Sequence, residues 1–431
     1  MIKQFQRIIL NEFVELKTNK FLLAVSGGID SMVLANLFYK LKFNFVIAHC
    51  NFNLRGDQNI KDELLVKKFA NQKKIKLSIK KFNTLDYVKS KKTSIQIAAR
   101  ELRYHWFFEL METNKIKYLV TAHNLNDQFE TILINMSRGT GFDGITGMNH
   151  KSNKIFRPLI SITRSQIEKY AIDNKVDWRE DSSNLSDKYL RNFIRNNILK
   201  KWMKYDNDLF INFRTTLKNL NLAKDVLKNN LINWKKKNFK KNKNFIIIST
   251  NELSKLNPLN FYLFELFKDY GFKNTKDLVN IIKSNSGKKL ISDTHILLKD
   301  RNQLILQKKE KSHKNQFYWD GLTKDLSPLN LKIVKSDSCD RNHIVLDNDK
   351  LKFPLEIRKW KNGDYFYPDG IEGKKKVSKY YKDTKLNLFQ KEAQWLLCSN
   401  NKIVWIVGLR GDKRFKFKSN SKNKIIIKCT V

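Results

Sequence analysis

An apolar run that ends in serine, two glycines and an aspartate limits the fold of this chain more than any other segment. The run Phe21–Val25 is followed by the sequence SGGIDS at residues 26–31, and a second apolar stretch then begins. This pattern predicts a buried strand, a sharp turn and a helix whose first backbone N–H groups point into the turn. Such N–H groups and the positive end of the helix dipole bind anions, and glycines let an anion approach the backbone closely. The segment is therefore predicted to hold a phosphate.

The polar side chains of this loop add further chemistry. Ser26 and Ser31 offer hydroxyl donors to a phosphate, and the carboxylate of Asp30 suits Mg²⁺. The loop has neither the lysine of the Walker pattern nor the spacing G-x-G-x-x-G, so two common nucleotide signatures are excluded. An ordinary serine–glycine turn between a strand and a helix is the alternative interpretation.

Length and charge limit the class of protein. A chain of 431 residues predicts two or three domains. No apolar stretch approaches the ~20 residues of a membrane span, and the N-terminus lacks a signal-peptide pattern, so we expect a soluble, cytoplasmic protein without a membrane partner. The net charge of +42 favours nucleic acid as a partner, the alternative being lysines accumulated on solvated faces. The four cysteines are scattered without a C-x-x-C pair, which argues against a local zinc or iron–sulfur site.

Strand-like and helix-like segments alternate up to about Tyr205. Further strands are predicted at Phe43–His49, Lys76–Phe82 and Tyr118–His123, and helices at Gly56–Gln72, Ser94–Thr113 and Asn126–Ser137. This alternation favours an α/β fold with a parallel sheet covered on both faces. Because ligands bind at the carboxyl ends of such strands, residues 26–31, 49–55 and 123–130 are expected to meet in one crevice.

The pattern changes after about Asp206. A long lysine-rich helical periodicity runs through residues 234–241, and short strands are predicted at Phe245–Ser249, Lys289–Leu298, Gln303–Lys308, Leu355–Lys359 and Ile403–Val407. The polar stretch Lys309–Gln316 resembles a linker. We therefore expect three domains: a catalytic domain at 1–205, a mainly helical domain at 206–312 and a small mixed α/β domain at 317–431.

A second cluster of polar residues follows the fourth predicted strand. Asp127 and Glu130 are three residues apart, so they share one face near the start of a helix that Asn126 is placed to cap. Two carboxylates there suit Mg²⁺ or a cationic amine. The alternative is that they only complement the helix dipole, with Glu130 as a capping-box partner.

Glycine and arginine are concentrated further along the chain. Four of the chain's 15 glycines lie within residues 139–147, which marks a functional loop, and Arg138 at its start is placed to meet phosphate. Arg191 and Arg195 are four residues apart on one predicted helix face, a spacing that suits phosphate clamping. Ion pairs with Glu180 and Asp181 are the alternative role for these two arginines.

These blocks occur in the order found in one known family. Residues 26–31, 49–55, 127–131, 138–141 and 180–195 resemble the tRNA(Ile)-lysidine synthase family of PP-loop ATP pyrophosphatases. The resemblance continues through residues 358–364 and 374–381; it is strongest over 20–200 and loosest over 206–310. It implies a PP-loop catalytic domain followed by tRNA-binding domains. One departure is Phe52, where family members often carry a histidine.

The resemblance also implies a reaction. Such an enzyme is an ATP-dependent ligase that forms a carbon–nitrogen bond at the wobble cytidine of the tRNA(Ile) with a CAU anticodon. ATP adenylates the C2 oxygen of the base and releases pyrophosphate, and the ε-amine of free L-lysine then attacks C2 and releases AMP. The resulting lysidine pairs with A rather than G, so the tRNA reads AUA instead of AUG.

Residue roles follow from matching the motifs. ATP contacts are expected from Ala24, Ser26, Gly27, Gly28, Ile29, Asp30, Ser31, His49, Arg100, Arg103, Arg138 and Gly139. Catalytic roles are expected for Asp30, Asp127, Glu130, Arg191 and Arg195, with Mg²⁺ on Asp30 and Asp127 and the substrate lysine on Asp127 and Glu130. Contacts to tRNA are expected from Arg55, Lys235, Lys236, Lys374, Lys375 and Lys376.

Other functions remain open from the sequence. A PP-loop tRNA thiolase needs paired cysteines, and Cys50 alone in the predicted catalytic domain argues against it. A glutamine-dependent synthetase would need a glutaminase domain, of which no motif is visible. A non-catalytic RNA-binding protein would be expected to lose the loop acids, yet Asp30, Asp127 and Glu130 are present. The oligomeric state is left open, a homodimer included.

Overall fold

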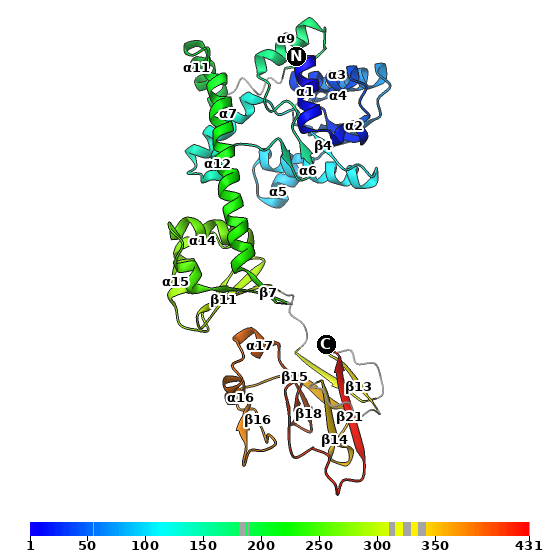
Figure 1. Ribbon diagram of the computed structural model, residues 1–431. Coiled ribbons are helices and arrows are strands. Elements are labelled where there is room, and N and C mark those ends of the chain that lie inside the picture. Colours follow the sequence, from blue (N-terminus) through cyan, green and yellow to red (C-terminus); the bar gives the residue numbers. More distant parts are fainter. Residues whose placement is uncertain are drawn as a thin grey trace. The chain divides into compact units, whose positions relative to one another are not determined.

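The chain folds into two compact units, Met1–Lys228 and Asn229–Val431 (Figure 1). The computed structural model describes residues 1–54, 56–180, 187, 189–242, 244–309, 315–321, 329–334 and 342–430. The three domain boundaries expected from the sequence stay a prediction. Most of the expected linker, residues 310–314, lies outside the described residues.

A six-stranded sheet forms the centre of the first unit. Its strands are β1 (Phe21–Ala24), β2 (Phe45–Asn51), β3 (Leu77–Lys81), β4 (Leu119–Val120), β5 (Lys151–Ser152) and β6 (Ile155–Phe156), in the order β3-β2-β1-β4-β6-β5. All neighbours pair in parallel except β5, which forms an antiparallel pair with β6. The predicted α/β class with a parallel sheet is confirmed. The short strands β5 and β6 were not predicted, because two residues show no periodicity.

Helices cover the sheet on both faces. They are α1 (Ile2–Glu12), α2 (Glu15–Thr18), α3 (Ile29–Lys40), α4 (Asp57–Gln72), α5 (Thr84–Lys91), α6 (Ile95–Thr113), α7 (Leu125–Ser137), α8 (Phe142–Ile145), α9 (Arg164–Asp173), α10 (Leu190–Phe193), the π-helix η2 (Ile194–Leu199) and α11 (Lys200–Tyr205). Leu23 packs in one cluster with α1, α3 and α9, whereas its neighbour Leu22 packs with Trp106 and Phe107 of α6. Successive strand residues thus serve opposite faces, as the alternation of side chains requires.

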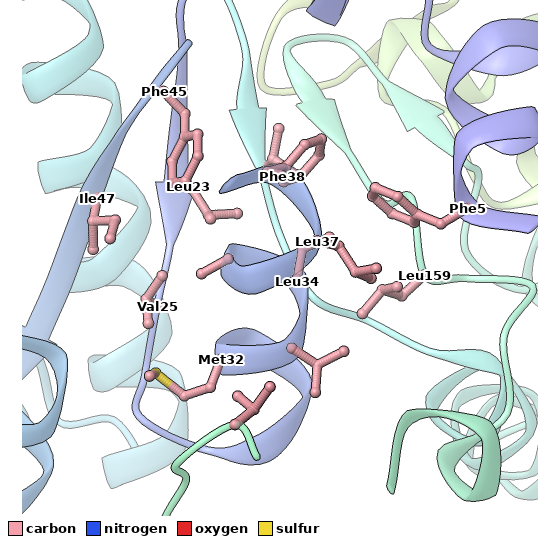
Figure 2. Packing of buried hydrophobic residues seen from close by; sticks show 14 of the residues in the cluster. Phe5, Leu23, Val25, Met32, Leu34, Leu37, Phe38, Phe45, Ile47 and Leu159 are labelled. Carbon is pink, nitrogen blue, oxygen red and sulfur yellow. The ribbon is translucent and has the colours of Figure 1, made fainter. Parts of the chain in front are cut away.

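The cluster around α3 fixes the helix against the sheet (Figure 2). Leu34 and Phe38 of α3 lie between the strand residues Leu23 and Phe45 and the side chain of Phe5 from α1 (Figure 2). Leu23, Leu34, Phe38 and Phe5 are wholly buried. Burial of a side chain of this size stabilises a fold by roughly 1.5–3 kcal/mol, so the start of α3 is held firmly at the end of β1.

The strand order determines where a crevice forms in the first unit. From β1 the chain moves outward through β2 to β3, and it then returns to β4 on the other side of β1. Connections that leave in opposite directions from neighbouring strands open a gap at the carboxyl ends of those strands. The loops after β1 and β4 therefore face one another at this edge of the sheet.

The long helix α12 (Leu209–Asn238) begins in the first unit and ends in the second. It leads to the antiparallel strands β7 (Lys240–Asn242), β8 (Phe245–Ser249), β9 (Lys289–Ile291), β10 (His295–Asp300) and β11 (Gln303–Lys308), with the helices α13 (Thr250–Ser254), α14 (Leu259–Phe267) and α15 (Thr275–Lys283). The single strand predicted at Lys289–Leu298 is wrong. Ser292 accepts a hydrogen bond from the backbone N of His295, so the chain turns there and forms the pair β9–β10.

The last part of the second unit is rich in strands. It contains β12 (Gln316–Trp319), β13 (Asn330–Ile333), β14 (His343–Asp347), β15 (Leu355–Lys359), β16 (Tyr365–Phe366), β17 (Lys375–Lys376), β18 (Trp395–Ser399), β19 (Lys402–Ile406), β20 (Arg410–Gly411), β21 (Lys424–Thr430), α16 (Val377–Asp383) and α17 (Leu388–Ala393). A five-stranded and a three-stranded sheet share one core around Trp405. Within the residues described here, no helix is both long and apolar enough to cross a membrane.

Candidate active site

The loop after β1 is braced by its own serines. Ser31 Oγ accepts a hydrogen bond from the backbone N of Ser26 at 3.1 Å and donates one to the carbonyl of Gly28 at 2.9 Å. Ser26 Oγ in turn accepts one from the backbone N of Gly28 at 3.3 Å. Gly28 is the N-cap of α3. The loop is therefore shaped before any anion binds, with the helix start presented to the crevice.

Gly27 connects this loop to two distant segments. Its φ of +95° lies in the region that favours glycine. Its carbonyl accepts a hydrogen bond from the backbone N of Arg179 at 3.1 Å, and Arg179 Nε lies 2.9 Å from Asp62 Oδ1 on α4. Asp62 and Arg179 are thus positioning residues for the loop that the sequence did not reveal.

Asp30 is held by two partners from other elements. Its Oδ2 lies 2.7 Å from Arg164 NH1, and its Oδ1 accepts a hydrogen bond from Asn124 Nδ2 at 2.9 Å. Burial raises the pKa of Asp30; the charge of Arg164 opposes this shift and that of Asp127 adds to it. Asp30 and Asp127 therefore lie near enough to repel one another, as expected for two carboxylates prepared for a cation.

The start of α7 is capped differently from the expectation. Asn124 is the N-cap and forms a capping box with Asp127, whose Oδ2 accepts a hydrogen bond from the backbone N of Asn124. The predictions that Asn126 caps this helix and that Glu130 completes the capping box are wrong. Asn126 instead accepts a hydrogen bond from the backbone N of Arg164. The difference arises because the cap lies two residues earlier than predicted, at Asn124, and the helix begins at Leu125.

Glu130 is wholly buried and binds both predicted arginines. Arg195 Nε and NH2 donate to its two carboxylate oxygens at 2.6 and 3.0 Å, and Arg191 Nε lies 3.2 Å from Oε2. Arg195 NH2 also lies 3.5 Å from Asp127 Oδ1, and Arg191 donates to Thr131. Of the alternative partners, Asp181 lies outside the described residues, whereas the ion pairs that Arg191 and Arg195 form within the described residues join them to acids of α7.

Two adjoining pockets open around the loop. One of about 410 Å³ is lined by aromatic side chains and Arg103, and one of about 680 Å³ is lined by several acids and arginines. Both pockets share the side chains or backbone of Ser26, Gly28, Asp30, Asp127 and Arg195. We refer to them as the aromatic pocket (with Phe52, Tyr104 and Phe107) and the acidic pocket (with Asp62, Glu168 and Glu180).

Most predicted ATP contacts lie at these pockets. The aromatic pocket is lined by Ala24, Ser26, Gly28, Asp30, Ser31 and Arg103, and the acidic pocket also by Ile29. Arg100 lies beside the aromatic pocket, with its guanidinium 4.9 Å from the ring centre of Tyr104. His49 is buried with its Nδ1 2.9 Å from the carbonyl oxygen of Val25, so its side chain braces the sheet.

Two predicted ATP contacts, Arg138 and Gly139, are not brought to the pockets. Arg138 and Gly139 follow the C-terminal end of α7, roughly 17 Å along the helix from Asp127 at 1.5 Å per residue. The glycine-rich loop beyond them is held by Gln128, which bonds Met148, and by Lys224 Nζ, 2.9 Å from Asp143 Oδ1. The predicted tRNA contacts stay a prediction: the second unit contains Lys235, Lys236, Lys374, Lys375 and Lys376, and Arg55 lies outside the described residues.

The structure adds one site residue that the sequence did not single out, His123, and it shows the surroundings of Phe52. Burial lowers the pKa of His123 to about 4, so its ring is neutral near pH 7, and its Nδ1 lies 2.9 Å from Thr121 Oγ1. Phe52 stacks on Phe82 with ring centres 5.4 Å apart, and Arg103 lies 5.1 Å from its ring centre. The wall of the aromatic pocket at this position is therefore a cation–π pair.

Oxygen donors suitable for a hard cation lie where the aromatic pocket and the acidic pocket adjoin. No cluster of three or more His, Cys, Asp or Glu side chains is arranged around a metal site in the described part of the chain. Mg²⁺ in nucleotide sites needs only one or two carboxylates, because substrate phosphates and waters complete its shell. Asp30 and Asp127, which both line the two pockets beside the phosphate loop, fit that requirement.

Comparison with known proteins gives matches along most of the chain. Family models match a PP-loop domain at residues 1–202, a TilS substrate binding domain at 240–309 and a TilS substrate C-terminal domain at 355–427. A tRNA(Ile)-lysidine synthase of Parabacteroides distasonis is 35% identical over 94% of this chain and 94% of its own length. One of Bacteroides thetaiotaomicron is 34% identical over 98% of both chains.

A solved structure gives a weaker likeness. The U34-tRNA thiolase NcsA from Methanococcus maripaludis, with its [4Fe-4S] cluster, is 19% identical, with a TM-score of 0.40 over 50% of this chain and 80% of that chain. A likeness of this size carries no argument about the reaction.

Proposed function

The chain belongs to the tRNA(Ile)-lysidine synthase family, and we propose that the two pockets of its first unit carry out the two steps of lysidine formation. The protein is an ATP-using ligase that modifies tRNA. ATP activates the C2 oxygen of the wobble cytidine, and free L-lysine then replaces AMP on that carbon. The substrate is the tRNA(Ile) with a CAU anticodon, which afterwards reads AUA in place of AUG.

The loop at residues 26–31 holds the phosphates of ATP. Negative charge builds between the α- and β-phosphates as pyrophosphate leaves, and preorganised backbone N–H donors stabilise that charge best. The internal bonds of Ser26 and Ser31 support this role, because they fix the donors before the reaction. The aromatic pocket, with Phe52 and Tyr104, offers flat surfaces to the adenine and to the cytosine.

Asp30 and Asp127 hold Mg²⁺ at the edge shared by the pockets. The support for this assignment is the mutual repulsion of the two carboxylates and their position on the loop side of both pockets. When bound there, Mg²⁺ supplies positive charge to the phosphates that leave. Arg164 and Asn124 hold the Asp30 carboxylate in place through its two oxygens.

The acidic pocket receives the lysine substrate. Its lining acids attract the ε-ammonium group. Asp127 lines both pockets, so it binds the ε-ammonium group next to the aromatic pocket. Lysine has a solution pKa of ~10.4, so its amine must lose a proton before it attacks. Glu130 is already bound by Arg195 and Arg191, and it therefore acts on the lysine by fixing Arg195 beside Asp127.

The second unit binds the body of the tRNA. Two family models of TilS substrate domains match there, and the net charge of +42 suits a polyanion. Lys235, Lys236 and Lys374–Lys376 are assigned to backbone phosphates, which position the tRNA without reading its sequence. Because ATP, free lysine and tRNA meet in the cytoplasm, we place the reaction there.

A thiolase reaction is disfavoured by the one cysteine near the site. Cys50 lines the aromatic pocket, and burial raises its pKa to about 12, so the sulfur stays protonated and is a poor nucleophile near pH 7. The other cysteines of the chain, Cys339, Cys398 and Cys429, come far later in the sequence, outside the first unit.

The observation that carries this proposal is that Asp127 and Asp30 line both pockets, which joins an ATP site to an amine site. The test is ATP-dependent incorporation of labelled lysine into a tRNA(Ile) transcript with a CAU anticodon. We expect incorporation by the wild-type protein and loss of at least 10²-fold in Asp127→Ala. Lys375→Ala, which leaves the first unit unchanged, is expected to retain turnover at saturating tRNA. Accumulation of adenylated tRNA without lysine transfer by the wild-type protein would overturn the assignment of the acidic pocket.

A further inference from the structure

A short hairpin in the second unit presents a tyrosine and lysines to solvent. Its strands β16 and β17 are antiparallel, with Tyr365 opposite Lys376 and Phe366 opposite Lys375. Directly opposed side chains lie on the same face of such a pair, and successive side chains lie on opposite faces. Phe366 is wholly buried, so its face is turned to the core. Tyr365, which is 43% exposed, therefore shares the solvent face with Lys376.

Two further side chains complete this solvent face. Lys374 Nζ lies 5.2 Å from the ring centre of Tyr365, and the ring of Tyr367 meets that ring edge to face, with centres 6.1 Å apart. Tyr367 is fixed by the guanidinium of Arg414, 4.4 Å from its ring centre, which also pairs with the buried Asp412 at 2.8 Å. The exposed ring thus packs against a firmly held neighbour. We refer to Tyr365, Tyr367, Lys374 and Lys376 as the tyrosine–lysine surface.

The loop that joins β16 to β17 is tied to residues in and after β20. Arg410 NH2 donates a hydrogen bond to the carbonyl oxygen of Asp369 at 2.8 Å, and Lys413 Nζ donates one to that of Ile371 at 3.0 Å. The backbone N of Lys413 also donates to the carbonyl oxygen of Tyr367 at 2.8 Å. The tyrosine–lysine surface is therefore shaped before a partner binds, which lowers the entropic cost of binding.

The lysines of this surface are not neutralised by acids. Within the part of the chain that the structure describes, the ion pairs of this region join Lys375 to Asp383 at 2.8 Å and Lys416 to Asp369, and none involves the two surface lysines. An exposed ring beside exposed cations is the combination that binds single-stranded nucleic acid, because the ring stacks on a base and the cations contact the phosphates. The surface therefore suits an unpaired nucleotide.

We propose that Tyr365 stacks on an unpaired base at the 3′ end of the tRNA, while Lys374 and Lys376 contact the adjoining phosphates. This inference rests on the proposed function, which makes tRNA the substrate and places its wobble cytidine in the first unit. Bases inside a stem are covered by their neighbours, so only an unpaired loop or end can offer a base to the ring. The other loops of a folded tRNA pack against one another, which leaves the 3′ end.

The test measures the Kd of the full chain for two transcripts of the tRNA(Ile) with a CAU anticodon, one complete and one without its unpaired 3′ nucleotides. We expect the wild-type protein to bind the complete transcript roughly tenfold more tightly, as for the stacking of one base. Tyr365→Leu should raise the Kd for the complete transcript by the same factor and leave that for the shortened transcript unchanged. Tyr365→Phe keeps the ring and should bind both transcripts as the wild-type protein does.

Replacement of the lysines tests the phosphate contacts. In Lys374→Ala and in Lys376→Ala, the slope of log Kd against log salt concentration should fall by about 0.7, the value for one phosphate of a single strand. Lys375→Ala is the matched comparison, because Lys375 lies on the other face and is already paired with Asp383, and it should change the slope less. The Kd for ATP should stay unchanged in all three variants, since the phosphate loop belongs to the first unit.

Tyr318→Leu is the control for the loss of an exposed tyrosine. Tyr318 is 66% exposed on β12, which forms one edge of the five-stranded sheet, whereas β20 beside the hairpin loop forms the other edge. This variant should bind both transcripts with wild-type affinity.

Equal affinity of the wild-type protein for the two transcripts would overturn the inference, and this result does not depend on the folding of any variant. So would an unchanged Kd for the complete transcript in folded Tyr365→Leu. An equal rise for both transcripts would also overturn it, because the contact would then lie elsewhere on the tRNA. A rise in Tyr365→Phe as large as in Tyr365→Leu would assign the contact to the hydroxyl group and exclude stacking. Failure of the proposed function would appear differently, as absence of lysine incorporation by the wild-type protein while these binding changes persist.

Discussion

The carboxylate of Glu130, wholly buried on α7, receives two hydrogen bonds from Arg195 at 2.6 and 3.0 Å. Burial lowers the pKa of the Arg195 guanidinium, but the hydrogen bonds and the charge of Glu130 raise it by more, so the net pKa shift is upward. The pair fixes the π-helix η2 against α7, and Arg195 lines both pockets. The folding of this region and the geometry of the site therefore depend on the same contact.

Replacing Glu130 by Gln is expected to destabilise the first unit by about 2 kcal/mol. Loss of one partner leaves a desolvated arginine, which costs about 3–5 kcal/mol in buried pairs. Because burial also raises the pKa of Glu130, the neutral side chain recovers part of that cost. Thermal unfolding of the full chain should show a Tm lower by roughly 4–8 °C. Glu15→Gln, which breaks the exposed pair with Lys151, should change stability by less than about 1 kcal/mol, and an equal loss in both variants would contradict the prediction.

Gly27→Ala is expected to weaken the phosphate loop through its backbone. The φ of +95° is unfavourable for alanine by about 1–2 kcal/mol, although the space around the new methyl group is ordinary, with Asp62 at 3.5 Å. We expect the Kd for ATP to rise about tenfold as the loop changes shape. Gly28→Ala is the comparison for folding, because Gly28 has a φ of −74°, which alanine also adopts. This variant should therefore unfold at the wild-type temperature. Calorimetric titration with ATP and a thermal melt of both variants check the pair; equal Kd and Tm values would contradict the argument.

The lowered pKa of His123 predicts that the stability of the first unit depends on pH. Its folded pKa is about 4, below the ordinary 6.5, because burial disfavours the charged ring. Between these two values the unfolded chain binds more protons than the folded chain, so this group lowers stability as the pH falls from 6.5 to 4. The full effect is on the order of 3 kcal/mol. Denaturant unfolding across this range should show a smaller loss for His123→Gln than for the wild-type protein, whereas parallel curves would disprove the shift.

Phe52 allows a test of the residue that departs from the family pattern. Phe52→Leu removes the cation–π contact with Arg103, which is worth about 0.5–2 kcal/mol. We expect KM for ATP or tRNA to rise roughly 2- to 30-fold with little change in kcat, because the ring forms a wall and carries no proton. Phe52→His should keep near-wild-type kinetics. A large fall in kcat for Phe52→Leu alone would indicate a chemical role.

The local parts of the site were predictable from the sequence. The strand–loop–helix pattern at residues 21–40 is a short-range signal, because it depends on an apolar run, two glycines and a helix start. The shared face of Asp127 and Glu130 follows from their spacing on a helix. The strand Phe245–Ser249 was also predicted at its observed bounds, since its apolar run is bounded by polar residues.

The long-range partners were not predictable. Arg164 and Asp30 are separated by 134 residues, and Asn124 and Asp30 by 94, so no local pattern joins them. The parallel pair of β4 with β6 joins residues far apart in the sequence, and β6 is a strand of two residues without a visible periodicity. Arg191 and Arg195 were recognised as a pair on one face, but their acid partner was expected in sequence neighbours and comes from α7.

The two outer strands of the six-stranded sheet affect how copies of the protein meet. An unpaired strand edge is a template on which another chain can add a strand and begin to aggregate. Here one edge strand, β3, ends in Lys80 and Lys81, and the other, β5, is two residues long and begins with Lys151. Adding a strand at either edge would bring lysines of like-charged chains together. The repulsion between these lysines therefore disfavours growth of the sheet at the active site into a fibril.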